Sequence, residues 1–269
     1  MIKYKSLIRD IDRCRVRHGH LAFWWLGQHS FVVKTCEAVM YLDPFLALHP
    51  KRRVPPLLKP GKVTHADFIF GSHDHADHID REVWPAMAAA SPRASFVVPE
   101  ILRGKVSREL GIPSRRFIGI DDGQSKRRSG VKITGIASAH ELLDPDPQTG
   151  QFACLGFVIE SGGCTIYHSG DCCIYEGLQT KLQRWQFDVV FLPINGRDAK
   201  RLASDCIGNM TYQEAADLAG ALRPGLTVPA HFDMFKGNLE DPSLFADYMR
   251  VKYPRLNVCV PDYGVRVSL

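Results

Sequence analysis

Short apolar runs rich in β-branched and aromatic residues recur along the chain, and glycine, proline or charged residues bound each of them. These runs predict β-strands, because such side chains suit a pleated, buried surface. The expected strands lie at residues 21–26, 30–34, 38–42, 67–71, 95–98, 117–120, 131–137, 154–160, 164–167, 187–194 and 226–230. The tail 257–268 predicts a strand pair around residues 262–264. Residues 1–20 show no regular spacing of apolar residues and predict a polar arm.

Helical signals alternate with these strands. Asp80 precedes an alanine-rich stretch that predicts a helix over about 81–90, and a second helix over 99–110 should stop at Gly111. Thr211 and Glu214 have capping-box spacing before an apolar helical stripe, and Asp241-Pro242 should begin the last helix. Strands and helices thus recur twice. We expect one α/β domain over residues 1–269, with the arm at 1–20, arranged as a four-layer αββα sandwich.

Composition narrows the class of protein. With 269 residues and 45% hydrophobic content, the chain can bury one large core. It has no run of eighteen apolar residues, no apolar stretch behind its first lysines and no C-x-x-C pair among its eight cysteines. We therefore expect a cytoplasmic protein with reduced thiols and no membrane contact. The net charge of +5 is scattered, so no nucleic-acid partner is expected, whereas a homo-oligomer stays open.

The run His73-Asp74-His75-Ala76-Asp77-His78 carries the strongest chemical signal. It directly follows the predicted strand at 67–71 and concentrates three imidazoles within six positions. Alternate side chains of an extended segment share a face, so His73 and His75 can bind one ion. The chain turning after Ala76 can present Asp77 and His78 to a second ion. One short loop therefore predicts two metal positions.

Two such positions need further ligands, and later strands supply them. The strand at 131–137 runs into His140, the strand at 164–167 leads to Asp171, and the strand at 226–230 runs into His231. Asp43 ends an early strand and is either a turn residue or a hydrogen-bond partner of a ligand imidazole. His29, in the turn after the first strand, is either at the mouth of the site or an ordinary surface residue.

These residues resemble a known family. The HxHxDH run, a strand-end His, a Gly-Asp and a late His are similar to the metallo-β-lactamase superfamily of binuclear hydrolases. Trp24-Trp25-Leu26-Gly27, Leu42-Asp43-Pro44 and Tyr167-His168-Ser169-Gly170-Asp171 are similar to its L-ascorbate-6-phosphate lactonase-like branch. The resemblance implies the same αββα fold. It also implies a ligand set in which Asp171 bridges two ions, held by His73, His75 and His140 and by Asp77, His78 and His231.

The expected activity is hydrolysis by a metal-bridging hydroxide, with Asp77 and His231 as catalytic residues. The resemblance favours opening of a lactone in a small anionic, phosphorylated sugar acid. Nitrogen and oxygen ligands fit two divalent ions, manganese or zinc. Asn195 and Arg197 follow the strand at 187–194 and are the expected substrate-binding residues, although a solvated loop with paired charges is the alternative.

Other readings stay open. A phosphodiesterase of the same superfamily would use the same ions, and a non-catalytic metal-binding or sensor protein is a further alternative. His75 disfavours a di-iron oxygen reductase, which usually has Glu at that position of the motif. The absence of a GxSxG sequence argues against a serine hydrolase. Cys172 is a less favoured ligand than Asp171, and His168 is expected to be a buried, hydrogen-bonded histidine rather than a further ligand.

Overall fold

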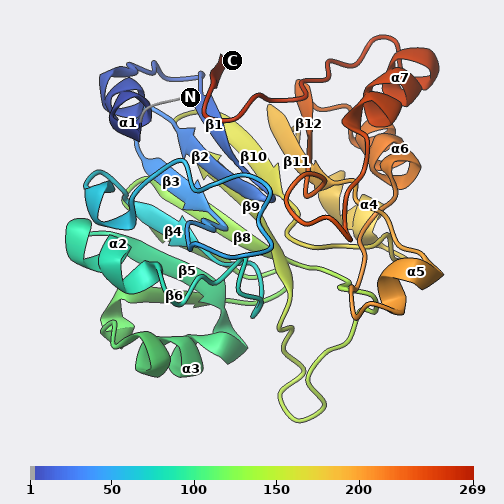
Figure 1. Cartoon of the computed structure of the whole chain (residues 1–269). Helices are drawn as coiled ribbons and strands as arrows, with labels where there is room; N and C mark the ends of the chain where they lie inside the picture. The colour runs from blue at the N-terminus through green and yellow to red at the C-terminus, as the bar shows by residue number, and fades with distance from the viewer. Residues whose placement is uncertain (1–3) are drawn as a thin grey trace.

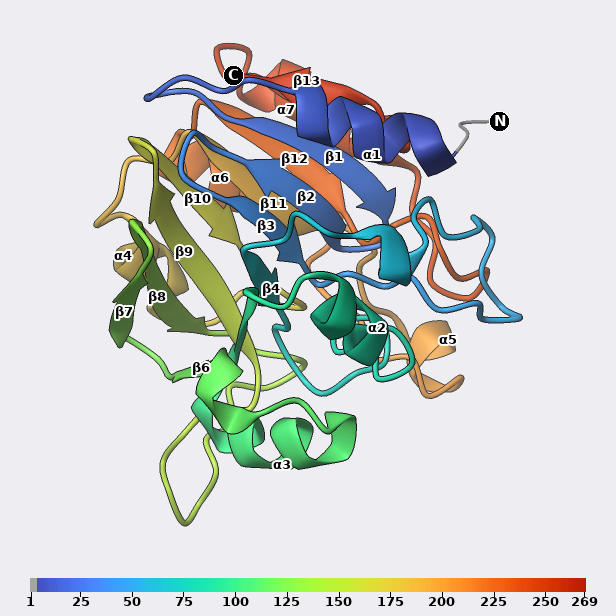
Figure 2. The same cartoon turned by 90° about the vertical axis from the view of Figure 1, so that its left-hand side faces the viewer.

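Two β-sheets pack face to face, and helices cover their outer faces (Figures 1 and 2). This computed structural model describes residues 4–269, so the first three residues of the predicted arm lie outside the described part. The four-layer αββα arrangement expected from the alternating strands and helices is confirmed.

The first sheet combines an antiparallel start with a parallel half. Its order is β13-β1-β2-β3-β4-β5-β6, in which β1, β2 and β3 pair antiparallel and β3 to β6 pair parallel. Its strands are β1 (Ala22–Gly27), β2 (Ser30–Lys34), β3 (Val39–Leu42), β4 (Phe68–Phe70), β5 (Ser95–Pro99), β6 (Phe117–Ile120) and β13 (Arg266–Ser268). The parallel half makes β3 and β4 end at the same edge.

The second sheet has the order β12-β11-β10-β9-β8-β7. Its strands are β7 (Ser125–Arg128), β8 (Val131–Ala137), β9 (Leu155–Ser161), β10 (Cys164–His168), β11 (Val189–Pro193) and β12 (Leu226–Ala230). The strands β7 to β10 pair antiparallel, and β10, β11 and β12 pair parallel. The strands predicted at 154–160 and 164–167 are confirmed as β9 and β10, and they form a hairpin with Cys164 opposite Ser161.

Helices divide between the two outer faces. The helices are α1 (Tyr4–Arg13), α2 (Trp84–Ala90), α3 (Glu100–Leu110), α4 (Leu178–Leu182), α5 (Ala199–Leu202), α6 (Tyr212–Leu222) and α7 (Pro242–Lys252), with 3₁₀ turns η1 (Pro60–Lys62) and η2 (Ser114–Arg116). Side chains of α1, α2 and α3 pack on the first sheet, and those of α4, α6 and α7 join the core of the second. The predicted capping box of Thr211 and Glu214 is present at the start of α6.

No helix in residues 4–269 is both long enough and apolar enough to cross a lipid bilayer.

Aromatic side chains fill the space between the sheets. Phe70 of the first sheet contacts Phe157 of the second, with ring centroids 5.3 Å apart. Phe31 and Phe191 meet in the same way at 4.2 Å. All four side chains are fully buried. The burial of such large apolar surfaces is the main stabilising contribution to the sandwich.

Two predictions for polar segments were wrong. The arm at 1–20 contains α1, whose Leu7 and Ile11 are buried together with Cys14 just after the helix. These residues follow the i, i+4, i+7 spacing of an amphipathic helix, so the helical pattern was present but covered only three apolar positions. Residues 121–130, where no strand was expected, contain strand β7, which pairs with β8 although all its side chains are exposed.

Two element boundaries also differ. The tail does not form its own strand pair, because β13 pairs antiparallel with β1 and completes the first sheet. The helix expected from residue 81 begins at Trp84, and Asp80 accepts hydrogen bonds from the backbone amides of Leu46 and Ala47. Its carboxylate therefore holds the loop after β3 in place.

Replacing Phe157 by alanine should remove the aromatic contact between the sheets and leave a cavity. We expect the free energy of unfolding to fall by about 3 to 5 kcal/mol, measured by denaturant titration with circular dichroism. Val251→Ala in α7 is the control, because Val251 is 80% exposed, and it should change stability by less than about 0.5 kcal/mol. Similar losses in the two variants would contradict this assignment of the core.

Candidate metal centre

The predicted ligands lie at one edge of the two sheets. Strands β8, β10 and β12 run in the same direction, because β9 is antiparallel to β8 and β10, and β12 is parallel to β10 through β11. The segments after their carboxyl ends deliver three ligands to the edge where the loop after β4 supplies four more. The structure thus brings together all seven predicted ligands: His73, His75, Asp77, His78, His140, Asp171 and His231.

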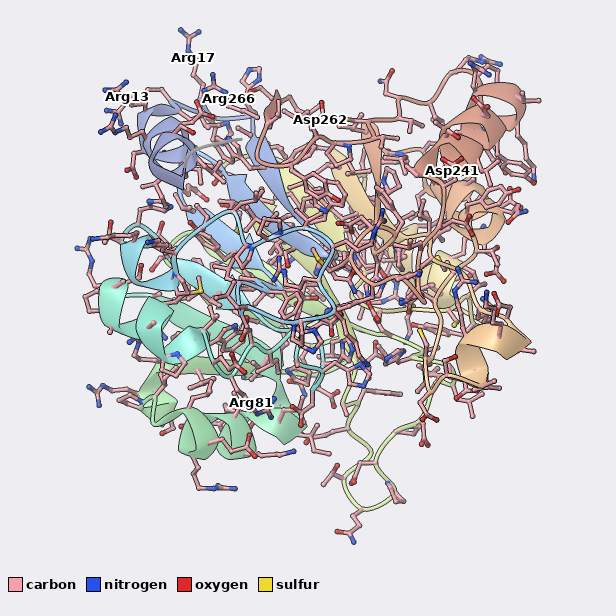
Figure 3. The ribbon with its side chains drawn as sticks, in the orientation of Figure 1. Arg13, Arg17, Arg81, Asp241, Asp262 and Arg266 are labelled. Atoms are coloured by element: carbon pink, nitrogen blue, oxygen red, sulfur yellow. The ribbon has the colours of Figure 1, made fainter. Side chains whose placement is uncertain are left out.

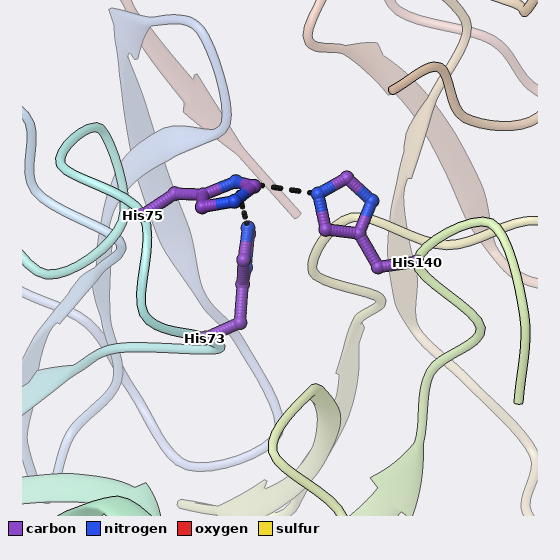
Figure 4. Close-up of side chains that lie close together, drawn as sticks. All are labelled: His73, His75 and His140. Atoms are coloured by element: carbon purple, nitrogen blue, oxygen red, sulfur yellow. Dashed lines mark hydrogen bonds between the residues drawn. The ribbon is translucent and has the colours of Figure 1, made fainter. Parts of the chain in front are cut away.

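Three imidazoles meet at one position. His73 Nε2 lies 3.0 Å from His75 Nδ1, and His140 Nε2 lies 3.2 Å from the same atom (Figure 4). A neutral imidazole nitrogen carries either one proton or one lone pair, so His75 Nδ1 cannot be paired well with both neighbours by hydrogen bonds. One cation that accepts three lone pairs resolves this arrangement. His73, His75 and His140 therefore fit a metal ion.

A second position lies beside the first. His78 Nε2 and His231 Nε2 lie 3.6 and 3.7 Å from Asp77 Oδ2. Asp171 directs Oδ1 to His78 Nε2 at 3.3 Å and Oδ2 to His231 Nε2 at 3.2 Å. His73, His78 and Asp171 also form a compact group, so Asp171 connects the two positions. His78 Nε2 and Asp171 Oδ1 are buried with no hydrogen-bond partner among the described residues, as expected of atoms that face a cation.

The charges at the second position also fit a cation. Burial lowers the pKa of His78, but Asp171, Asp77 and Asp43 outweigh it and raise that pKa to about 9. Burial likewise opposes protonation of His231, yet Asp171 and Asp77 raise its pKa well above the usual value. The carboxylates at this position therefore require positive charge beside them, and a divalent ion supplies it without the protons on the imidazoles.

The buried carboxylate of Asp43 fixes the predicted ligand His78 through a set of hydrogen bonds. Its Oδ2 atom lies 2.6 Å from His78 Nδ1, 3.0 Å from His168 Nε2 and 2.7 Å from Ser72 Oγ, which donates to it. Its Oδ1 atom accepts a hydrogen bond from the Ser72 backbone amide at 2.8 Å. These contacts support the second interpretation of Asp43, as the partner of a ligand imidazole. They also place His168 in the buried, hydrogen-bonded position that the sequence led us to expect.

The loop is held from its outer side as well. Asp74, between His73 and His75, accepts hydrogen bonds from Arg81 and from Lys105 of α3. Arg81, labelled in Figure 3, also donates to Glu109 of the same helix. The alternation of side chains therefore turns the two histidines toward the site and the aspartate toward α3.

Sequence reasoning missed Gln28 and misplaced His29. Gln28 is 2% exposed, and its Nε2 atom donates to Asp77 Oδ2 at 2.8 Å and lies 2.9 Å from His231 Nε2. His29 is fully buried, 3.7 Å from Asp171 Oδ1, so it is neither at the mouth of the site nor on the surface. Burial, together with nearby His168, lowers its pKa to about 3. Their position in the turn after β1 was the one available signal.

The predicted substrate residues bond to residues other than the predicted ligands. Arg197 donates through both Nη atoms to the Glu214 carboxylate at 2.7 Å, and it lines a recess of about 220 Å³ that Glu141, next to His140, also lines. Asn195 is buried and bonds to the side chains of Asn209 and Asn238. Their roles in substrate binding stay predictions.

Cys172 shows no sign of metal binding. Its thiol is fully buried and donates to the Cys173 carbonyl, and burial raises its pKa to about 12. It belongs to none of the ligand groups formed by residues 4–269.

The chain is similar to known proteins of one superfamily. Residues 39–232 match the family model described as "Beta-lactamase superfamily domain". Among curated relatives, a UPF0173 metal-dependent hydrolase of Caldivirga maquilingensis is 26% identical over 246 residues, covering 91% of this chain and 96% of the relative. Another from Thermococcus onnurineus is 28% identical over 222 residues, covering 82% and 88%.

Solved structures have the same fold. A metallo hydrolase of the archaeon Ignicoccus hospitalis aligns with a TM-score of 0.73 at 21% identity, covering 93% of this chain and 98% of that one. An isothiocyanate hydrolase from Delia radicum gut bacteria aligns with a TM-score of 0.70 at 17% identity, covering 91% and 98%. The family model spans more than half of the chain, including the loop after β4 and His231, and the chain therefore belongs to the metallo-β-lactamase superfamily of metal-dependent hydrolases.

Proposed function

We propose that this chain is a binuclear metal-dependent hydrolase that opens a lactone in a small anionic metabolite, as in the L-ascorbate-6-phosphate lactonase-like branch. The observation that carries the proposal is the placement of Asp171 between two groups of ligands. Its two carboxylate oxygens face His78 and His231, and His73 of the imidazole group lies within the same cluster. Two neighbouring ions would divide the work, with one acting on the attacking water and the other on the substrate oxygen.

The proposed ligands form two groups that differ in their donor atoms. His73, His75 and His140 would hold one ion through neutral nitrogens, and Asp77, His78 and His231 would hold the other, with Asp171 shared. When bound, the ions lower the pKa of water toward neutrality and polarise the substrate oxygen. Asp77 is 19% exposed, so this carboxylate is the member of the second group that can also exchange a proton with the substrate. His231 is the imidazole proposed to act with it.

The donor chemistry limits the choice of metal. The ligand groups contain imidazole and carboxylate and no thiolate, which suits manganese or zinc. We propose manganese or zinc at both positions. The proposal adds no cysteine ligand, because the thiol of Cys172 is held in the protonated form by burial.

The substrate is proposed to extend from the ions into the recess beside His140. Arg197 stands at this recess and pairs with Glu214, with the two side chains 43% and 31% exposed. An exposed ion pair of this kind contributes only about 0 to 1 kcal/mol. An anionic substrate can therefore share the Arg197 guanidinium at little cost. Asn195 would act by holding the segment that carries Arg197, since its amide bonds to Asn209.

Metal content and substrate preference of one purified sample test the proposed function. We expect about two ions per chain by mass spectrometry and hydrolysis of a phosphorylated sugar lactone that a chelator abolishes. Cleavage of bis-p-nitrophenyl phosphate alone would replace the lactonase by the phosphodiesterase alternative. Bound ions without hydrolysis of either compound would favour the metal-binding or sensor alternative, and a protein that takes up no metal would refute all three.

His75→Ala should remove a ligand without damage to the core, because His75 is exposed. We expect the variant to lose at least one ion and its kcat/KM to fall by at least about 100-fold, with an unchanged circular dichroism spectrum. His18→Ala is the control, since His18 is also exposed and lies against Gly163, at the end of β10 away from Asp171. Full activity of His75→Ala would rule out this ligand set.

Asp43→Asn should weaken metal binding although Asp43 is not placed as a ligand. The amide cannot accept hydrogen bonds from His78, His168 and Ser72 as the carboxylate does, so the His78 ring loses its fixed orientation. We expect affinity for one ion to fall about 10- to 100-fold, measured by competition with a chromophoric chelator. Asp67→Asn, which alters a carboxylate bonded to the Val39 amide, should leave affinity unchanged.

A further inference from the structure

Gln28 presents its carboxamide to the second metal position. Its Nε2 atom lies 2.8 Å from Asp77 Oδ2 and 2.9 Å from His231 Nε2. Ligand atoms bound at about 2.0 to 2.1 Å to one ion are separated from each other by about 2.9 to 3.4 Å in octahedral or tetrahedral geometry. The carboxamide is therefore spaced from these two side chains as a neighbouring ligand would be.

The side chain is held in this place by its own backbone. The Gln28 carbonyl accepts hydrogen bonds from the His231 amide at 3.1 Å and from Trp25 Nε1 at 3.0 Å. The Gln28 amide donates to Asp233 Oδ1 at 2.9 Å. The turn after β1 is thus bonded directly to the segment that carries His231, and the carboxamide keeps a fixed distance from that imidazole.

The conformation of Gln28 is a second, independent sign of function. Its φ of +55° lies in the left-handed region, which glycine or asparagine occupies at lower cost than glutamine. Seven non-glycine residues in the described part of the chain have a positive φ, and Asp43 and His231 at this site are among them, with φ values of +42° and +60°. Strained backbone collects at functional sites because surrounding contacts maintain it there. A long, buried amide in a turn that would suit a smaller residue indicates that the side chain itself is used.

We propose that Gln28 is a further metal ligand at the second position, beside Asp77, His78 and His231, and that it binds through its amide oxygen. A half-turn about the last side-chain bond exchanges the amide oxygen and nitrogen at the place described above. The nitrogen donates to Asp77 when that carboxylate is free, and the oxygen faces the cation when an ion is bound. The inference concerns metal binding alone and holds whichever substrate is hydrolysed.

This ligand makes the two positions different in coordination. The first position has the three imidazoles of His73, His75 and His140, whereas the second would gain the amide oxygen of Gln28 as an additional donor. Oxygen donors and a higher coordination number favour manganese over tetrahedral zinc. Gln28 would therefore bias the second position toward an ion that accepts five or six ligands.

Metal titration of Gln28→Leu and Gln28→Glu, without substrate, tests the proposal. Chelator-treated protein would be titrated with manganese, in competition with a chromophoric chelator, and with cobalt, followed by its visible spectrum. In Gln28→Leu we expect one of the two dissociation constants to rise at least about 10-fold, the other to stay unchanged, and the cobalt bands to intensify as coordination falls. Gln28→Glu keeps an oxygen at the same distance and should bind both ions.

Gln186→Leu is the matched control, because Gln186 is exposed and its amide bonds only to the Arg223 carbonyl among described contacts. It should leave both constants unchanged. Weaker binding in Gln28→Leu with an unaltered cobalt spectrum would overturn the proposal and make Gln28 a hydrogen-bond partner of Asp77. Unchanged affinity in Gln28→Leu, or equal losses in Gln28→Leu and Gln28→Glu, would overturn it as well. Circular dichroism identifies any unfolded variant, and Gln28→Glu then decides the question.

Discussion

The site depends on one buried carboxylate. Asp43 directly follows β3 at the edge where the parallel strands of the first sheet terminate. Its carboxylate contacts His78, His168 and Ser72, and all four residues are fully buried. Because His168 ends β10 in the second sheet, this carboxylate joins the two sheets at the point where the metal centre lies. A buried carboxylate without hydrogen-bond donors would destabilise the fold strongly. The donors around Asp43 and the position of the loop after β4 therefore depend on each other.

The two sheets also meet through backbone contacts. The Leu155 amide at the start of β9 donates to the Ser72 carbonyl just before His73. A side chain at Gly170 would lie 2.7 Å from Ser72 Cβ, and the φ of +60° at this position also favours glycine. Glycine thus allows Asp171 to approach the loop after β4. This close approach brings one carboxylate near both groups of histidines, each of which takes members from both sheets.

The sequence predicts most of this arrangement, and the exceptions have physical reasons. The strand-end positions of His140, Asp171 and His231 were predictable because each follows a clear β-rich run. α1 was missed because one polar helix of ten residues has only two or three buried positions, and the tail was misassigned because β13 pairs with the distant β1. Gln28 could not be identified, since its contacts with Asp77 and His231 arise from tertiary packing across 49 and 203 positions of the chain.

We expect specificity to come from segments that the sheets do not determine. The ligands follow strands whose directions are set by pairing, so the metal centre is a consequence of the fold. The recess next to Glu141 is instead lined by that residue and by six residues between Arg197 and Gly208, in a stretch that connects strands and contains only the short α5. Loops of this kind can change without loss of the core. The same strand ends can therefore serve different hydrolytic reactions, because the fold determines where a bond is attacked and the loops determine which molecule is bound there.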